Sequence, residues 1–169
     1  METSPLRTSS LLVPVGVPSS LVKADATSLH SAHILVVDDI VVNQRVLVYK
    51  LEQYGYRDVR VASSGKEALE QIHRLQPLVF NLILMDVMMP EMDGLETTRK
   101  IKAMPAYAPI PVVGVTGNTM PEDIQECLDA GMIDVMTKPV NTKKLMSFVS
   151  KYLTSSLVDS ASSMLGACY

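Results

Sequence analysis

The fold of this chain is decided by the segment HILVVDD, residues 33–39. Its four central residues are consecutive aliphatic side chains, most of them β-branched, and two acidic residues, Asp38 and Asp39, follow at once. Nearly continuous β-branched hydrophobicity is typical of a strand that is covered on both faces of a parallel sheet. The segment therefore predicts a buried strand that ends in a pair of carboxylates.

Four further apolar runs of this kind follow along the chain, at residues 58–62, 80–85, 111–115 and 133–136. Stretches with helical spacing separate them, as where Leu47, Leu51 and Tyr54 recur at i, i+4 and i+7. Regular alternation of strands and helices predicts an α/β fold with a doubly wound, five-stranded parallel sheet and helices on both faces. Functional groups of such sheets gather beyond the carboxyl ends of the strands.

Helix boundaries are marked by residues with specific backbone roles. Ser64-Gly65-Lys66-Glu67 reads as a capping box that opens the second predicted helix. Gly55 and Gly131 stand where helices are expected to end, since glycine tolerates the left-handed conformation found there. Pro121 fits the first turn of the fourth predicted helix.

Three segments are expected along the chain. Residues 1–32 are rich in Ser and Pro and predict a disordered arm, residues 33–153 form the folded domain, and residues 154–169 are expected to be a flexible tail. No run reaches the roughly 18 consecutive apolar residues of a membrane span. We therefore expect no membrane insertion by this chain.

Composition narrows the class of function. The residues are 47% hydrophobic and 20% charged, and the formal net charge is −3. A negative charge argues against binding nucleic acid, which normally needs a basic face. Two distant cysteines, Cys127 and Cys168, make neither a disulfide framework nor a zinc pattern, which suits a reduced, cytoplasmic protein.

Polar side chains stand at the carboxyl ends of four predicted strands, and they should meet at one edge of the sheet: Asp38, Asp39, Asp86, Thr116 and Lys138. Three crowded carboxylates repel one another unless a cation neutralises them. Oxygen ligands of high negative charge suit Mg²⁺, which pairs with one or two carboxylates and a phosphate. A remaining carboxylate can attack phosphorus to form an aspartyl phosphate, with the lysine and the hydroxyl binding phosphoryl oxygens.

Taken together, these residues resemble the receiver domain of two-component response regulators. The resemblance rests on ILVVDD (34–39), MDVMMPEMDG (85–94), VTGN (115–118), AGM (130–132) and KP (138–139). It extends over roughly His33 to Leu153, and Asn43 and Cys127 make it most similar to receivers of hybrid histidine kinases. The resemblance also implies the flavodoxin-like strand order 2-1-3-4-5.

The resemblance implies a role for each matching residue. Asp86 is the expected phosphoacceptor. Asp39 is expected to bind Mg²⁺ directly, Asp38 through water, and the backbone carbonyl of Met88 as a further ligand; Mn²⁺ is an expected substitute. Lys138, before an expected cis Pro139, would contact the phosphoryl group.

The resemblance also implies partners. The phosphoryl group would come from a histidine kinase or a histidine phosphotransfer protein. Thr116 would move toward the phosphate and signal to a downstream protein, through the face made by the helix from Pro121, the strand at 133–136 and the helix containing residues 145–152. Neither nucleic acid nor membrane is an expected partner, and the chain is either free-standing or part of a longer hybrid kinase.

One position departs from the family pattern, and a second affects the expected lifetime of the phosphoryl group. Val135 stands three residues before Lys138, where the family usually has an aromatic side chain that moves together with the threonine. Met88 is apolar at a place where a polar side chain could orient a hydrolytic water, so we hypothesise slow loss of the phosphoryl group.

Three other classes of protein share parts of this pattern. A phosphatase or mutase with an Asp nucleophile needs a second Asp two residues later, where Met88 stands, so the chain is not expected to be an enzyme with a separate substrate. No Gly-x-Gly-x-x-Gly or Walker motif supports a nucleotide site. The remaining alternative is a degenerate receiver that binds proteins without being phosphorylated.

Overall fold

The computed structural model describes residues 32–74 and 80–165, with side chains as far as Leu153. Within these residues, strands and helices alternate along the chain. The strands are β1 (His33–Val37), β2 (Asp58–Ala62), β3 (Leu82–Asp86), β4 (Val112–Thr116) and β5 (Asp134–Thr137). The helices are α2 (Val41–Gln53), α3 (Gly65–Arg74), α4 (Gly94–Lys102), α5 (Pro121–Asp129) and α6 (Thr142–Leu165).

All five strands are parallel and lie in the order β2-β1-β3-β4-β5, which confirms the predicted fold class and strand order. The sequence order reverses at β1, which lies between β2 and β3. The register of the central pair places Val37 beside Met85. The residues that follow these two, Asp38 and Asp86, are therefore neighbours at the carboxyl edge of the sheet.

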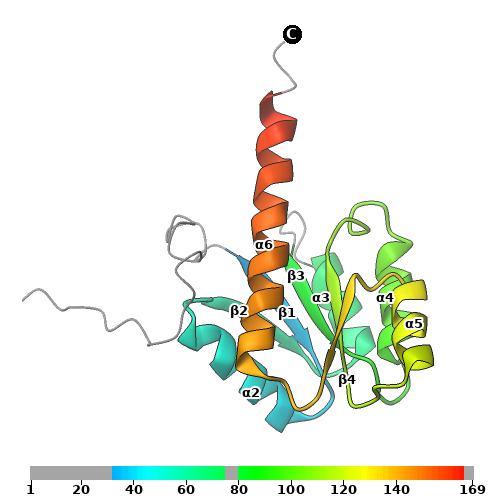
Figure 1. The fold of residues 1–169 in the computed structure, drawn as a ribbon. Coiled ribbons are helices and arrows are strands. Elements are labelled where there is room, and N and C mark those ends of the chain that lie inside the picture. Colours follow the sequence, from blue (N-terminus) through cyan, green and yellow to red (C-terminus); the bar gives the residue numbers. More distant parts are fainter. Residues whose placement is uncertain (1–31, 75–79, 166–169) are drawn as a thin grey trace, which may run out of the picture.

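Helices cover both faces of the sheet, as Figure 1 shows. α2 and α6 pack on one face, where Leu47, Leu51, Leu145 and Val149 join the core. α3, α4 and α5 pack on the other face. Since every residue of β3 and β4 is buried, the apolar side chains of these strands each contribute about 1.5–3 kcal/mol to folding.

The predicted helix boundaries are confirmed in their main features. Gly55 and Gly131 have positive φ angles of 92° and 98° after α2 and α5. Ser64 Oγ accepts a hydrogen bond from the Glu67 backbone N–H at 3.1 Å, as a capping box requires. The Glu67 carboxylate, however, accepts from the N–H of Ser63 at 2.8 Å, one residue before the expected donor.

The C-terminal part differs from the sequence prediction. The flexible tail was expected from Thr154, but α6 runs without a break from Thr142 to Leu165. The physical reason is that neither proline nor glycine interrupts this stretch. The predicted arm at residues 1–32 lies outside the described residues except for Ala32, and the predicted domain limits of 33 and 153 stay a prediction.

Within the described residues, none of the helices combines the length and the apolar character that crossing a membrane requires.

Candidate functional site

Three carboxylates meet at the carboxyl edge of the sheet. Asp38 and Asp39 follow β1, and Asp86 is the last residue of β3. One oxygen of each side chain lies within 4.8 Å of the others. Asp38 and Asp86 are only 1% and 3% exposed, so water cannot screen their repulsion effectively. The structure thus brings together the three acids that the sequence singled out.

Asp38 is held by several donors. Its Oδ1 accepts hydrogen bonds from the Ile40 backbone N–H at 2.9 Å and from Asn43 Nδ2 at 3.1 Å. Its Oδ2 accepts from Lys138 Nζ at 2.9 Å. The carboxylate is therefore fixed in position and mostly satisfied by the protein.

Lys138 links the acids across the sheet. Besides its contact with Asp38, its Nζ lies 2.7 Å from Asp86 Oδ2. Burial by itself lowers the pKa of Lys138, but the bonds to Asp86 and Asp38 outweigh it, so the pKa is raised. Burial raises the pKa of Asp86, helped by the charge of Asp38 and opposed by Lys138. One ammonium thus contacts two of the three carboxylates, and the site keeps an excess of negative charge.

Asp39 carries the observation that points most directly to a cation. Its Oδ1 is buried and has no hydrogen-bond partner within the described residues. A buried carboxylate oxygen without a partner is costly, because it has lost its hydration without compensation. A divalent cation among the three acids would satisfy this oxygen, so the donor set fits the Mg²⁺ that the sequence predicted.

Met88 and Gly94 shape the loop that follows Asp86. The Met88 backbone N–H donates to Asp86 Oδ1 at 3.2 Å, and its side chain is 66% exposed. A Cβ on Gly94 would lie 2.1 Å from the Asp86 backbone oxygen. Only glycine allows α4 to begin this close to the end of β3. That Met88 offers its carbonyl to a metal stays a prediction.

Thr116 ends β4 with its side chain inside the protein. It is 1% exposed, and its Oγ1 accepts a hydrogen bond from the Asn118 backbone N–H at 3.0 Å. The Thr116 carbonyl accepts from the Lys138 N–H at 2.7 Å, which ties the ends of β4 and β5 together. The predicted cis bond between Lys138 and Pro139 is present.

Val135 points into the core that α3, α4 and α5 cover. It is 8% exposed, and its Cγ2 would lie 3.7 Å from a Cβ on Gly114. The sulfur of Met132 lies nearer, at 2.7 Å from the same point. A methionine, rather than an aromatic ring, therefore fills the space over β4 two residues before Thr116.

One functional neighbour was missed from the sequence. Gln44 is 6% exposed, and its Nε2 donates to the Asp38 backbone carbonyl at 2.6 Å and to Ser63 Oγ at 3.1 Å. It thereby fixes the turn that carries the acidic pair. The available signal was its helical spacing: Gln44 lies three and seven residues before Leu47 and Leu51, on the face of α2 that packs on the sheet.

Comparison with known proteins identifies the family. Residues 34–150 match the family described as the response regulator receiver domain. The chain belongs to this family. It is therefore a receiver domain of two-component signalling, homologous to the receivers of phosphorelays, as the sequence motifs predicted.

Relatives of this receiver domain include hybrid histidine kinases. It is 32% identical over 154 residues to the osmosensing histidine protein kinase SLN1 of Saccharomyces cerevisiae, covering 90% of this chain and 12% of that protein. It is 36% identical over 120 residues to two-component system protein A of Emericella nidulans, covering 71% of this chain and 17% of that protein. The chain thus spans less than a fifth of the length of these relatives.

A solved structure of similar fold contains a metal. The receiver domain of a sensor histidine kinase from Pseudomonas aeruginosa, determined with a magnesium ion coordinated in its active-site cleft, has a TM-score of 0.66 and 32% identity. The match covers 73% of this chain and 98% of that one. Receiver domains thus bind Mg²⁺ at an acidic pocket of the kind seen here.

Proposed function

We propose that Asp86 accepts a phosphoryl group from a phosphohistidine of a histidine kinase or histidine phosphotransfer protein. The reaction requires Mg²⁺, or Mn²⁺ in its place, held by Asp38, Asp39, Asp86 and the Met88 carbonyl. The observation that carries the proposal is the position of buried Asp86 beside Lys138 and beside Asp39, whose buried oxygen has no partner in the part of the chain that the structure describes. A cytoplasmic location accords with this reaction.

In the transfer step, an oxygen of ionised Asp86 attacks phosphorus and forms the acyl phosphate. The P–N bond of the donor breaks, and its electron pair returns to the imidazole ring. Mg²⁺ supplies positive charge to the phosphoryl oxygens and to the carboxylates around them. Lys138 turns from the Asp86 carboxylate to a phosphoryl oxygen, since its Nζ already lies 2.7 Å from the attacking group.

Thr116 then senses the product. Its hydroxyl, which accepts from Asn118 in this structure, donates to a phosphoryl oxygen and draws the end of β4 toward Asp86. Because the Lys138 N–H holds the Thr116 carbonyl, the movement reaches the start of the β5–α6 loop. Val135 has no ring to swing with it, so Met132 against Gly114 is the packing contact that must adjust.

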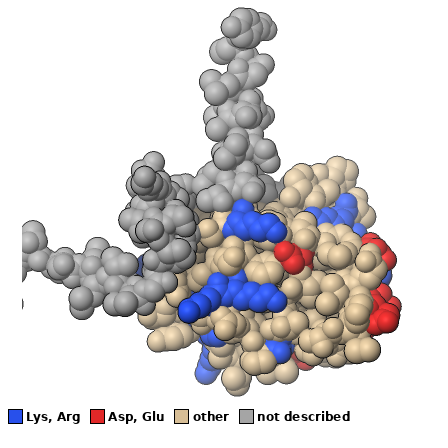
Figure 2. Space-filling model, viewed as in Figure 1, with Lys and Arg blue, Asp and Glu red and all other residues tan. Residues whose placement is uncertain are grey.

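The downstream partner reads the face made by α5, β5 and α6. α5 contributes acidic side chains, among them Glu122 and Asp123 in its first turn. α6 contributes exposed Lys143, Lys144 and Lys151. Figure 2 shows basic side chains where α2 and α6 lie and acidic ones at the side where α5 lies. A partner with the opposite arrangement of charges suits this face.

The phosphodonor approaches from the mouth of the site, which is lined by apolar side chains. Ile40, Val41 and Val42 after β1 are 51%, 51% and 67% exposed. Met88 after β3 and Met120 after β4 are 66% and 60% exposed. A partner that covers these residues buries apolar surface and excludes water from the reacting groups.

Labelling by a small phosphodonor tests the proposal. The chain should become phosphorylated by acetyl phosphate with MgCl₂, but not with EDTA, and Asp86→Asn should abolish the label. Asp129→Asn, which alters an exposed acid of α5, should label like the wild type. A folded wild-type chain that takes no label would instead support the degenerate, non-phosphorylated receiver, and a label that survives Asp86→Asn would refute the assignment of the acceptor.

A further inference from the structure

The orientation of Asp39 depends on the two peptide groups that flank it. The Asp38 carbonyl belongs to the first of these groups, and it accepts a hydrogen bond from Gln44 Nε2 at 2.6 Å. The Ile40 N–H belongs to the second, and it donates to Asp38 Oδ1 at 2.9 Å. Because a peptide group is planar and rigid, a bond to its carbonyl or its N–H restrains the whole plane. Gln44 thus restrains the backbone from which the Asp39 side chain extends.

A second bond holds the Gln44 amide in place. Its Nε2 also donates to Ser63 Oγ at 3.1 Å, in the turn between β2 and α3. Ser63 is fixed in turn, because its N–H donates to Glu67 Oε2 at 2.8 Å. An NH₂ group has two hydrogens, so these two acceptors use both of them. Any rotation of the amide therefore weakens both bonds at once.

Burial makes the Gln44 amide difficult to replace with water. Asp38 is 1% exposed and Gln44 is 6% exposed. Loss of the amide would leave the Asp38 carbonyl without this donor, and its peptide group would be free to turn. Mg²⁺ requires near-ideal octahedral geometry from its ligands. Since Asp39 shares that peptide group, a small turn would move its carboxylate away from the position that a cation requires.

We propose that Gln44, supported by Ser63, is a positioning residue that determines how tightly the site binds its divalent cation. Gln44 acts through the Asp38 carbonyl and contributes no atom to the cluster of carboxylates. The inference rests on the proposed function only through the cation that Asp39 would hold. Loss of an outer-shell partner of this kind typically lowers metal affinity about 10- to 100-fold. The turn between β2 and α3 is thereby part of the support of the metal site.

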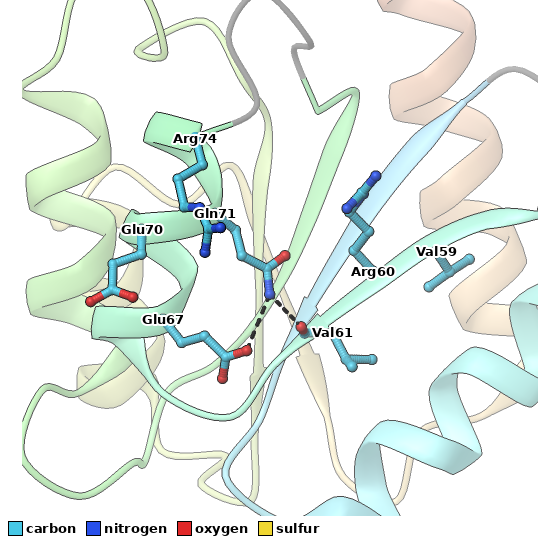
Figure 3. Close-up of a pocket in the computed structure, with 7 residues that line it drawn as sticks. All are labelled: Val59, Arg60, Val61, Glu67, Glu70, Gln71 and Arg74. Atoms are coloured by element: carbon cyan, nitrogen blue, oxygen red, sulfur yellow. Dashed lines mark hydrogen bonds between the residues drawn. The ribbon is translucent and has the colours of Figure 1, made fainter.

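Gln71 in α3 offers a control with the same kind of bonds. Its Nε2 donates to the Val61 carbonyl at 2.7 Å and to Glu67 Oε1 at 3.2 Å, as Figure 3 shows. Like Gln44, it therefore joins a helix to a backbone carbonyl at the edge of the sheet. Glu67 holds Ser63 through its other oxygen, so replacement of Gln71 leaves that bond in place. The groove that Gln71 lines includes none of the three acids.

Titration of the full chain with MgCl₂, followed by NMR, tests this inference. Gln44→Met keeps the approximate size of the side chain and removes the amide, so the dissociation constant for Mg²⁺ should rise about tenfold or more. Gln71→Met should leave this constant within about twofold of the wild type, since it touches no part of the support. Ser63→Ala should cause a smaller rise than Gln44→Met, because the bond to the Asp38 carbonyl remains. Ser63→Ala added to Gln44→Met should cause no further rise, because Ser63 acts through the amide.

Two further measurements separate positioning from a general role in folding. Urea unfolding in EDTA identifies the conditions in which each variant is fully folded, and the titrations are made there. Labelling of Asp86 by acetyl phosphate is then followed at increasing Mg²⁺ concentration. In Gln44→Met the concentration that gives half the maximal rate should rise by the same factor as the dissociation constant. A loss of fold stability alone would change neither quantity in the folded protein.

Several results would overturn the inference. They are an unchanged dissociation constant in Gln44→Met, an equal rise in Gln71→Met, and a further rise when Ser63→Ala is added to Gln44→Met. If Gln44→Met does not fold, Ser63→Ala decides alone, and an unchanged constant in that variant has the same meaning. A wild type that binds Mg²⁺ but takes no label would refute the proposed function, while the titrations would still decide the role of Gln44.

Discussion

Replacement of Lys138 by methionine tests the electrostatic account of the site. The ammonium is the shared partner of Asp38 and Asp86, at 2.9 and 2.7 Å, and both acids are almost fully buried. Methionine keeps most of the aliphatic stem and removes the charge. The variant therefore leaves buried carboxylates that repel one another with no cation between them.

The expected loss of stability is large for one substitution. Removal of one partner of a buried ion pair costs about 3–5 kcal/mol. The Lys138 side chain is 26% exposed, so solvent screens part of the interaction and the expected loss in EDTA at pH 8 is about 2–3 kcal/mol. Added Mg²⁺ should recover part of this loss, since a cation among the acids replaces the missing charge.

The loss should depend on pH. Burial holds the pKa of folded Asp86 above its unfolded value, and removal of Lys138 raises that pKa further. The folded variant then binds a proton more tightly than the unfolded chain, so its stability falls as the pH rises from about 3.9 through the folded pKa. The pairing in the wild type persists across this range because the pKa of Lys138 is raised. The loss caused by the substitution should accordingly be smaller at pH 5 than at pH 8.

Urea unfolding of both proteins at pH 5 and pH 8, in EDTA, measures these differences. Lys100→Met is the matched control: its Nζ lies 2.8 Å from Glu96, but both side chains are about half exposed, and the loss should stay below about 0.5 kcal/mol. An equal loss for the two variants, or a loss from Lys138→Met that does not change with pH, would refute the reasoning.

Three further outcomes are expected. Asp39→Asn should abolish most of the stabilisation by Mg²⁺, about 2.7 kcal/mol at one hundred times the wild-type dissociation constant, in a thermal melt with MgCl₂; an unchanged shift would exclude Asp39 as a ligand. Gly94→Ala should cost about 3 kcal/mol or more in urea unfolding because its Cβ meets the Asp86 backbone, whereas Gly117→Ala, with open space around it, should cost far less; similar losses would contradict the contact. Met88→Asn should shorten the half-life of the acyl-phosphate label severalfold, and a half-life that stays the same would count against slow hydrolysis caused by the apolar side chain.

The sequence predicted the strands and the meeting of the acids well, for a physical reason. Runs of consecutive aliphatic residues marked the strands, and the first two strands end where they were predicted, although β2 at the edge of the sheet is only partly buried. β3 begins two residues later than expected, at Leu82. Asn81 before it uses its side chain to accept from the His33 N–H at 2.8 Å, a contact that depends on the neighbouring strand.

Other features depend on tertiary contacts that sequence patterns do not reveal. Gln44 resembles any polar residue of a helix until the turn at Asp38 is placed beside it. The need for glycine at position 94 arises from the approach of α4 to Asp86 rather than from a positive φ angle. The length of α6 could be predicted from the sequence. Its residues after Leu153 include no helix breaker, and this local signal outweighs the many serines.

The crowding of three acids beside a single lysine has an evolutionary consequence. A chain freed from the need to hold a cation would become more heat-resistant by losing Asp39, since that loss removes a buried oxygen without a partner among the described residues and relieves repulsion in the metal-free protein. A screen for thermal tolerance alone should therefore enrich neutral residues at position 39. Retention of Asp39 under such a screen would mean that the repulsion among the acids is weaker than their geometry suggests.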